Sequence, residues 1–280
     1  MSSVVPRVDS HLTSSVLAEN PSGMTLEGTN TYLIGDPGAD SVVILDPGPA
    51  DMAEEHVEAV LAAAEGRRVE LILVSHHHGD HTGAVEVFAS RTGAPVRGGS
   101  PEWSRGAAPL VHGERIPAAG VVLTAWHTPG HTSDSFSFAL PDDGAAGSVL
   151  TGDTILGRGT TMLDHPDGTL ADYLRSLETL ISLGDATVLP GHGPALPSIA
   201  AVATQYRQHR QQRLDQLRTL LQEGDAADRE TVHARDPAAL EDLARRLAET
   251  IYPDVTGIVR AVAGKTVAAH LAYLAHHPGD

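Results

Sequence analysis

The apolar positions in the first two thirds of the chain predict alternating strands and helices. Short apolar runs bounded by Gly, Pro and Asp are typical of strands. We expect strands at residues 30–34, 41–45, 71–74, 121–126, 135–140, 148–150 and 187–189. Apolar residues at helical spacing predict helices at residues 51–65, 83–92 and 171–183. Strands and helices that alternate without a strict repeat favour an α/β sandwich over an all-helical or all-β fold.

The last third of the chain has a different pattern, in which helical spacing dominates. Residues 198–222 form a long helical pattern, and the polar residues 223–236 interrupt it. Helical spacing then resumes in two further stretches, of which the last covers residues 257–276. We therefore predict a main domain of residues 1–197 and a small helical domain of residues 198–280.

Composition limits where the protein works and what it can bind. A chain of 280 residues with 41% hydrophobic residues is long enough for a sizeable core. No apolar run approaches the roughly 20 residues that cross a bilayer, and the first residues lack the basic-then-apolar pattern of a signal peptide. We expect a cytoplasmic protein with no membrane partner. The chain has no cysteine, so any metal must be held by histidines and carboxylates.

The charge balance bears on partners. With 36 acidic and 19 basic residues, the net charge is −17, so a polyanion such as RNA meets repulsion at long range. A local basic patch can still bind phosphates, and the helix over residues 198–222 carries Arg207, Arg210, Arg213 and Arg218. We favour a solvated face of a packing helix for these arginines over a phosphate-binding surface.

The main chemical motif follows the apolar run at residues 71–74. It reads His76-His77-His78-Gly79-Asp80-His81, which places four potential ligands, His76, His78, Asp80 and His81, within six residues. A loop after a strand can spread such side chains around two neighbouring points, unlike the i, i+4 spacing of a helical H-E-x-x-H site. Zinc readily accepts histidine nitrogen and carboxylate oxygen. His77 lies inside the motif, but its neighbours take the ligand positions.

Three further ligand candidates stand where predicted strands end beside a glycine. They are His131 in Thr-Pro-Gly-His-Thr, Asp153 in Leu-Thr-Gly-Asp and His192 in Leu-Pro-Gly-His-Gly. Glycine gives the backbone freedom at such turns, and loops at a sheet edge commonly carry function. Asp46 also follows a strand; it is either a turn residue before Pro-Gly or a group that orients a ligand histidine.

In this order, these seven candidate ligands resemble the ligand set of the metallo-β-lactamase superfamily. The resemblance spans residues 20–195 and implies an αββα sandwich with a glyoxalase II-type binuclear site between the sheets. It implies a first metal held by His76, His78 and His131, a second held by Asp80, His81 and His192, and a bridging Asp153. We expect two divalent ions, with Zn²⁺ as the metal.

Other segments resemble one subgroup of that superfamily. Residues 20–32, 152–160 and 190–194 are similar to motifs of the lactamase-beta-like subgroup, which includes a mitochondrial endoribonuclease and some acyl-carrier thioesterases. The C-terminal helices resemble its winged-helix-like extension. That region is expected to cap the active site, carry specificity or form a homodimer, and these alternatives stay open.

The resemblance implies a hydrolase in which two ions share a hydroxide that attacks the substrate. We expect Asp80 to be catalytic, combining ligation with orientation of that hydroxide. An ester or thioester of a small or carrier-bound acyl group is the favoured substrate. The alternatives are cleavage of single-stranded RNA and nucleic-acid binding beside a vestigial metal site. The acidic charge and the aromatic content of only 4%, which leaves few platforms for stacking bases, favour the acyl substrate.

Overall fold

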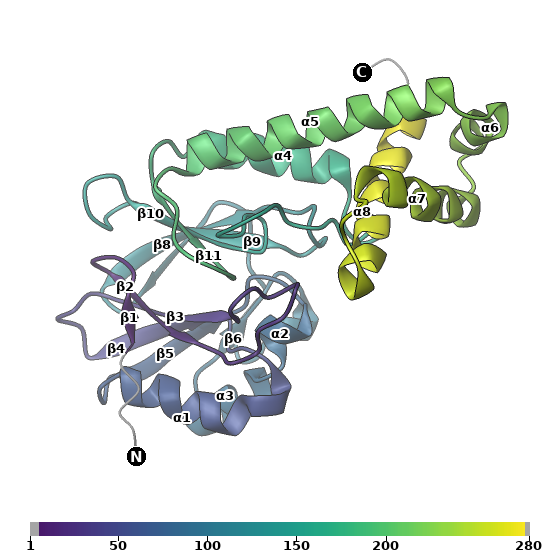
Figure 1. The fold of residues 1–280 in the computed structure, drawn as a ribbon. Helices are drawn as coiled ribbons and strands as arrows, with labels where there is room; N and C mark the ends of the chain where they lie inside the picture. Colours follow the sequence, from purple (N-terminus) through teal and green to yellow (C-terminus); the bar gives the residue numbers. More distant parts are fainter. Residues whose placement is uncertain (1–5, 278–280) are drawn as a thin grey trace.

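The computed structural model describes residues 6–277. Two β-sheets pack face to face, and helices cover the outer face of each sheet (Figure 1). The predicted αββα sandwich with a helical C-terminal region is therefore confirmed. Among the described residues, no helix is both long and apolar enough to cross a bilayer.

The first sheet contains six strands in sequence order. They are β1 (Arg7–Val8), β2 (Thr13–Leu17), β3 (Asn30–Ile34), β4 (Ser41–Leu45), β5 (Arg68–Leu73) and β6 (Val96–Arg97). The β4–β5 and β5–β6 pairs are parallel and the others antiparallel. Alternate residues of β4 face opposite ways: Val42 and Ile44 pack against the outer helices, whereas Val43 and Leu45 pack between the sheets.

Three helices and a short 3₁₀ turn accompany the first sheet. They are η1 (Ala50–Met52), α1 (Ala53–Ala63), α2 (Gly79–Thr82) and α3 (Val85–Thr92). Val57 and Val60 of α1 and Phe88 of α3 are buried against the sheet. Parallel strands need such crossover helices between them, which explains the helices after β4 and β5.

The second sheet has the order β11-β10-β9-β8-β7. Its strands are β7 (Glu114–Ala118), β8 (Val121–His127), β9 (Phe136–Leu140), β10 (Ser148–Gly152) and β11 (Thr187–Pro190), with η2 (Pro101–Trp103) preceding them. Only β10 and β11 pair in parallel, and α4 (Leu170–Ile181) connects them. The carboxyl ends of β10 and β11 therefore meet at one edge.

The C-terminal region consists of helices. They are α5 (Ile199–Glu223), α6 (Ala226–Ala234), α7 (Pro237–Ile251) and α8 (Gly257–His276). One hydrophobic cluster joins Leu177 of α4, Leu217 of α5, Leu243 of α7 and Leu271 of α8. The region thus shares a core with the outer face of the second sheet. The domain boundary at residue 197 stays a prediction. So does the winged-helix-like relationship, because the structure assigns no strand between residues 191 and 277.

The pattern of apolar residues missed the short strands β1, β2, β6 and β7 and the helix α6. Strand β2 reads Thr-Ser-Ser-Val-Leu and strand β7 contains Pro117, so neither has a strong strand signal. Helix α6 buries none of its residues, so its polar sequence lacks the apolar spacing that predicts a helix. The prediction of a solvated basic face on α5 is wrong at Arg210, which is only 1% exposed.

Candidate metal centre

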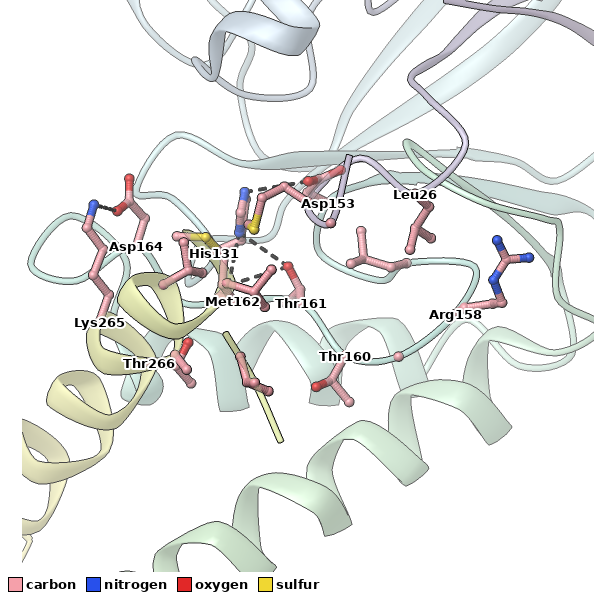
Figure 2. Close-up of a pocket in the computed structure, with 18 of the residues that line it drawn as sticks. Leu26, His131, Asp153, Arg158, Thr160, Thr161, Met162, Asp164, Lys265 and Thr266 are labelled. Atoms are coloured by element: carbon pink, nitrogen blue, oxygen red, sulfur yellow. Dashed lines mark hydrogen bonds and ion pairs between the residues drawn. The ribbon is translucent and has the colours of Figure 1, made fainter. Parts of the chain in front are cut away.

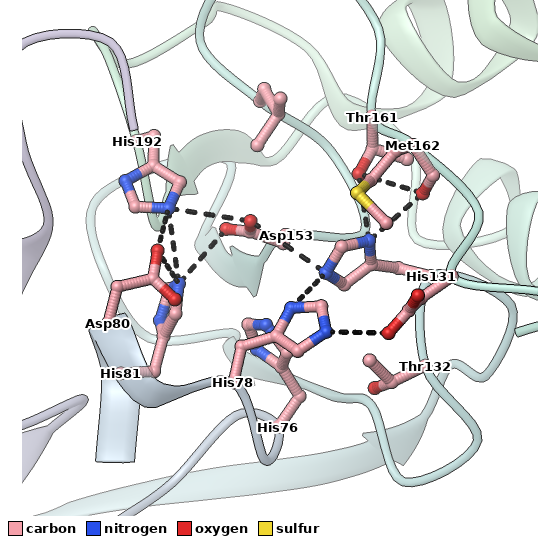
Figure 3. Close-up of polar contacts among 12 residues, drawn as sticks. His76, His78, Asp80, His81, His131, Thr132, Asp153, Thr161, Met162 and His192 are labelled. Carbon is pink, nitrogen blue, oxygen red and sulfur yellow. Dashed lines mark hydrogen bonds and ion pairs between the residues drawn. The ribbon is translucent and has the colours of Figure 1, made fainter. Parts of the chain in front are cut away.

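The structure brings all seven predicted ligand residues together at one edge of the sandwich (Figure 3). The motif after β5 leads directly into α2, whose first turn carries Asp80 and His81. Asp153 follows β10, His192 follows β11, and His131 lies in the loop between β8 and β9. Strand ends from both sheets thus position the side chains.

The first group consists of His76, His78 and His131, whose ligand atoms lie within 4.8 Å of one another. His131 Nε2 is 3.1 Å from His78 Nδ1. The Nε2 atom of His76 is buried and has no hydrogen-bond partner among residues 6–277. A buried nitrogen of this kind is normally paired, so its environment lacks one polar or charged neighbour.

The second group consists of Asp80, His81 and His192, again with ligand atoms within 4.8 Å of one another. The Nε2 atoms of His81 and His192 are 3.2 Å apart. Asp80 Oδ2 lies 3.1 Å from His192 Nε2 and 3.7 Å from His81 Nε2. Three potential ligand atoms therefore surround one point.

Asp153 lies between the two groups (Figure 3). Its Oδ1 is 3.3 Å from His81 Nε2, and its Oδ2 is 3.4 Å from His192 Nε2. The same Oδ2 is 3.8 Å from His131 Nε2, in the other group. One carboxylate thus approaches both groups, as the role of a bridging ligand requires.

Hydrogen bonds on the outer side of the rings fix which nitrogen faces the centre. His131 Nδ1 donates to Met162 O at 2.9 Å, and His192 Nδ1 donates to Gly28 O at 3.0 Å. A carbonyl oxygen only accepts, so Nδ1 carries a proton in each ring, and the Nε2 of the neutral form would present a lone pair to the centre. This is the arrangement expected of a metal-binding histidine.

Asp46 plays the corresponding role for His81, because Asp46 Oδ2 is 2.9 Å from His81 Nδ1. The structure thus shows the contact that the interpretation of Asp46 as an orienting group requires, while the role of His81 as a ligand stays a prediction. Ser75 supports it: its backbone N–H and its Oγ each donate to the Asp46 carboxylate at 2.8 Å. Ser75 Oγ is also 3.0 Å from His76 Nδ1, so one short network orients two rings.

The carboxylates favour positive charge at the centre. Burial would raise the pKa of Asp80, but His81 and His192 outweigh burial and lower it to about 2. The neighbouring histidines likewise hold the pKa of Asp153 well below its ordinary value, against the effect of burial. Burial lowers the pKa of His192, yet Asp153 and Asp80 raise it to about 9. Both carboxylates therefore stay ionised and favour positive charge beside them, which protonated histidines or a bound cation can supply.

These observations show that the residues fit divalent cations. In their neutral forms, His81 and His192 would direct two lone pairs at each other across 3.2 Å, a contact that a cation between them would make favourable. A cation in the first group would supply the missing partner of His76 Nε2. Nitrogen and carboxylate donors without sulfur suit Zn²⁺ and similar divalent ions. The ligand assignments themselves remain predictions.

Sequence reasoning missed Asp164. Its Oδ2 is 3.1 Å from His78 Nε2, and Lys265 of α8 donates to its Oδ1 at 2.5 Å. Asp164 also forms a third set of nearby ligand atoms with His77 and His78. No motif surrounds it in sequence, so only the folded chain identifies it. His77 Nδ1 lies 2.9 Å from Asp134 Oδ1, in agreement with its exclusion from the predicted ligand set.

Gly130, beside His131, is required for packing as well as for its turn. Its φ is +134°, and a Cβ there would lie 2.4 Å from Cα of Tyr173. We expect Gly130→Ala to lower the free energy of unfolding by more than about 2 kcal/mol, measured by urea denaturation. Gly144→Ala is the matched control: its φ is +72°, but no atom lies within 4 Å of the added Cβ. Equal losses in the two variants would contradict the packing argument.

An αββα sandwich whose strand ends gather five histidines and two aspartates defines a metallo-β-lactamase fold. The chain belongs to the metallo-beta-lactamase superfamily, since the family model matches residues 24–192. The match agrees with the range of residues 20–195 that carries the resemblance in sequence. The protein is therefore a member of a hydrolase family.

Individual relatives support the same placement. The chain is 36% identical over 189 residues to the atrochrysone carboxyl ACP thioesterase of Aspergillus fumigatus, covering 66% of this chain and 56% of that protein. It is 33% identical over 209 residues to the beta-lactamase-like protein 2 homolog of Drosophila melanogaster, covering 68% of each. The chain thus spans little more than half of the length of the Aspergillus relative.

A solved structure matches almost the whole chain. A metallo-beta-lactamase family protein from Thermus thermophilus superposes with a TM-score of 0.75 at 24% identity. The superposition covers 95% of this chain and 94% of that protein. The likeness therefore extends beyond the residues matched by the family model and includes the C-terminal helices.

Proposed function

We propose that the protein is a binuclear, zinc-dependent hydrolase that cleaves a thioester or ester of an acyl group. The observation that carries the proposal is a cavity of ≈430 Å³ that opens directly onto the metal centre (Figure 2). His78, Asp80, His131 and Asp153 line its polar end. An acyl group bound in this cavity would lie beside the candidate metal ligands.

The rest of the cavity wall is largely apolar. Its apolar side chains come from the loop before β3, the loops around β10 and the C-terminal region: Met24, Leu26, Leu156, Met162, Val255 and Val262. An apolar wall stabilises the methylene groups of an acyl chain by removing them from water. The relative from Aspergillus fumigatus, named a carboxyl ACP thioesterase, further supports the acyl substrate. We propose that the C-terminal helices serve specificity by completing this wall.

The chemistry can be divided between the cations and the protein. When bound, two divalent cations lower the pKa of water towards neutrality and polarise the substrate carbonyl. Asp80, 28% exposed and lining the cavity, accepts a hydrogen bond from the attacking water and orients it. The outer contacts of His81, His131 and His192 hold their rings in place during this step. A thiol leaving group has a pKa of about 8.5, so it departs without a strong general acid.

Three substrates test the proposed function. We expect the zinc-loaded protein to hydrolyse butyryl-N-acetylcysteamine faster than the matched oxygen ester, and to leave single-stranded RNA intact. Chelation should abolish hydrolysis, and two zinc ions per chain, counted by mass spectrometry, should restore it. Preferential cleavage of RNA would favour the endoribonuclease alternative. Tight, salt-sensitive RNA binding without any hydrolysis would favour the vestigial metal site.

A further inference from the structure

Three cationic side chains line the cavity, and two of them are neutralised. Lys265 pairs with Asp164 (Figure 2), and Arg158 pairs with Glu27. Arg210, from α5, also lines the cavity, and no carboxylate of residues 6–277 lies within ion-pair distance of it. Arg210 is therefore the cation of this wall that lacks a counter-charge.

The surroundings of Arg210 satisfy only part of its hydrogen-bonding capacity. The residue is 1% exposed, its Nη2 donates to Thr161 O, and its guanidinium carbon lies 5.1 Å from the centre of the Tyr173 ring. Its Nε has no partner in the part of the chain that the structure describes. A guanidinium has five N–H donors, and burying an unpaired charge costs several kcal/mol. The charge of Arg210 therefore has no anionic partner among the described residues, and a bound anion would supply one.

Neighbouring titratable groups do not supply that anion. His209 lies beside Arg210 on α5, and His270 of α8 is 1% exposed. Burial and the nearby Arg210 lower the pKa of His209 to about 4 and that of His270 to about 3, so both rings are neutral at pH 7. Arg213 lies against the ring of Tyr252 and adds positive charge. This local excess of positive charge around Arg210 contrasts with the net charge of −17 for the chain.

We propose that Arg210 binds an oxyanion of the substrate, and that this oxyanion is a carboxylate carried by the acyl group itself. The planar guanidinium matches a carboxylate in geometry and charge. The proposal rests on the proposed function and narrows its substrate class to thioesters or esters of acyl groups that end in a carboxylate.

The position of Arg210 favours the acyl group over a distant carrier as the source of the anion. Arg210 donates to the carbonyl of Thr161, and Thr161 Oγ1 lies 3.2 Å from His131 Nδ1. A single residue therefore separates the guanidinium from a candidate metal ligand. Arg210 also lines the same cavity as His78 and Asp153, so one short acyl group could place its carboxylate at Arg210 and its carbonyl at the candidate metal centre.

Matched thioesters of one phosphate-free thiol test this proposal. We expect the protein to hydrolyse glutaryl-N-acetylcysteamine with a higher kcat/KM than the pentanoyl thioester, which has a similar chain without the carboxylate. Arg210→Gln should lower kcat/KM for the glutaryl thioester by about 30-fold and for the pentanoyl thioester by less than about threefold. Arg207→Gln is the control on the same helix, because Arg207 is exposed and pairs with Glu178; it should change neither value.

Substrate dependence separates binding from a structural role. If Arg210 only holds the Thr161 carbonyl in place, Arg210→Gln will lower kcat/KM for both thioesters equally, and the proposal is wrong. The proposal is also wrong if Arg210→Gln lowers kcat/KM only for coenzyme A thioesters, because the anion that Arg210 binds is then a phosphate of the carrier. Arg210→Lys, which keeps the buried charge, serves if the glutamine variant does not fold; it should weaken the glutaryl preference without removing it.

A binding measurement keeps this proposal distinct from the proposed function. If no thioester is hydrolysed by the unaltered protein, the proposed function fails, but Arg210 can still be tested by calorimetry with the product acids. Glutarate should bind the zinc-loaded protein at least about tenfold more tightly than pentanoate, and Arg210→Gln should remove that difference. Equal affinities for the two acids in the unaltered protein would overturn the assignment.

Discussion

Asp153→Ala is expected to remove bound zinc and to lower kcat/KM for thioester hydrolysis at least about a thousandfold. Asp153 is a carboxylate that approaches both groups, with His81 and His192 on one side and His131 on the other. Its loss leaves neighbouring cations without the negative charge between them, so their mutual repulsion increases. Metal content measured by mass spectrometry and kcat/KM measured on the same preparation check the prediction together.

Two further variants make the Asp153 result specific. Asp153→Asn keeps the shape of the side chain but removes its charge, and we expect weaker zinc binding with the fold intact. Asp142→Ala removes an exposed carboxylate from the turn after β9 and should leave metal content and activity unchanged. Two tightly bound ions and normal turnover in Asp153→Ala would rule out the bridging role. One retained ion with full activity would instead indicate a mononuclear enzyme.

The candidate ligands could be predicted from sequence because their positions depend on local structure. Each follows an apolar strand and lies beside or close to a glycine, as in the segments that contain His131, Asp153 and His192. Strand β4 is buried on both faces, so its residues Val42 to Leu45 appear as a short continuous apolar run. Strand ends from both sheets, at one edge of the sandwich, then bring the ligands together.

The surroundings of the ligands depend on contacts between distant segments, which local patterns do not encode. Asp164 meets His78 across 86 positions of the sequence, and Lys265 reaches Asp164 across 101. The sequence does contain a sign that Arg210 is buried, although counting basic residues along the helix hides that sign. It falls at helical spacing with the buried residues Tyr206, Leu214 and Leu217, so it occupies the apolar stripe of α5. A charged residue on such a stripe, more than a count of basic residues, indicates a functional position.

Asp46→Asn is expected to lower the affinity of the second group for zinc by about 10- to 100-fold. The Asp46 carboxylate accepts hydrogen bonds from the backbone N–H and Oγ of Ser75 and faces His81 Nδ1. An amide has one accepting oxygen, so its NH₂ group must face one of these donors. If the amide oxygen keeps the bond to Ser75 N–H, its NH₂ group faces His81 Nδ1. That contact favours the ring with its proton on Nε2, which removes a lone pair from the metal centre.

The loss in Asp46→Asn should be larger for the second cation, because Asp46 contacts His81 of the second group directly but reaches His76 of the first group only through Ser75. Asparagine also tolerates the left-handed backbone of this position, where φ is +56°, so the variant should fold. Competition with a chelator should show that one site is weakened more than the other, while thermal unfolding stays close to that of the unaltered protein. Ser75→Ala, which removes one donor and leaves the carboxylate facing His81, should weaken zinc binding less. Unchanged affinity at both sites in Asp46→Asn would show that the charge on Asp46 does not control the proton on His81.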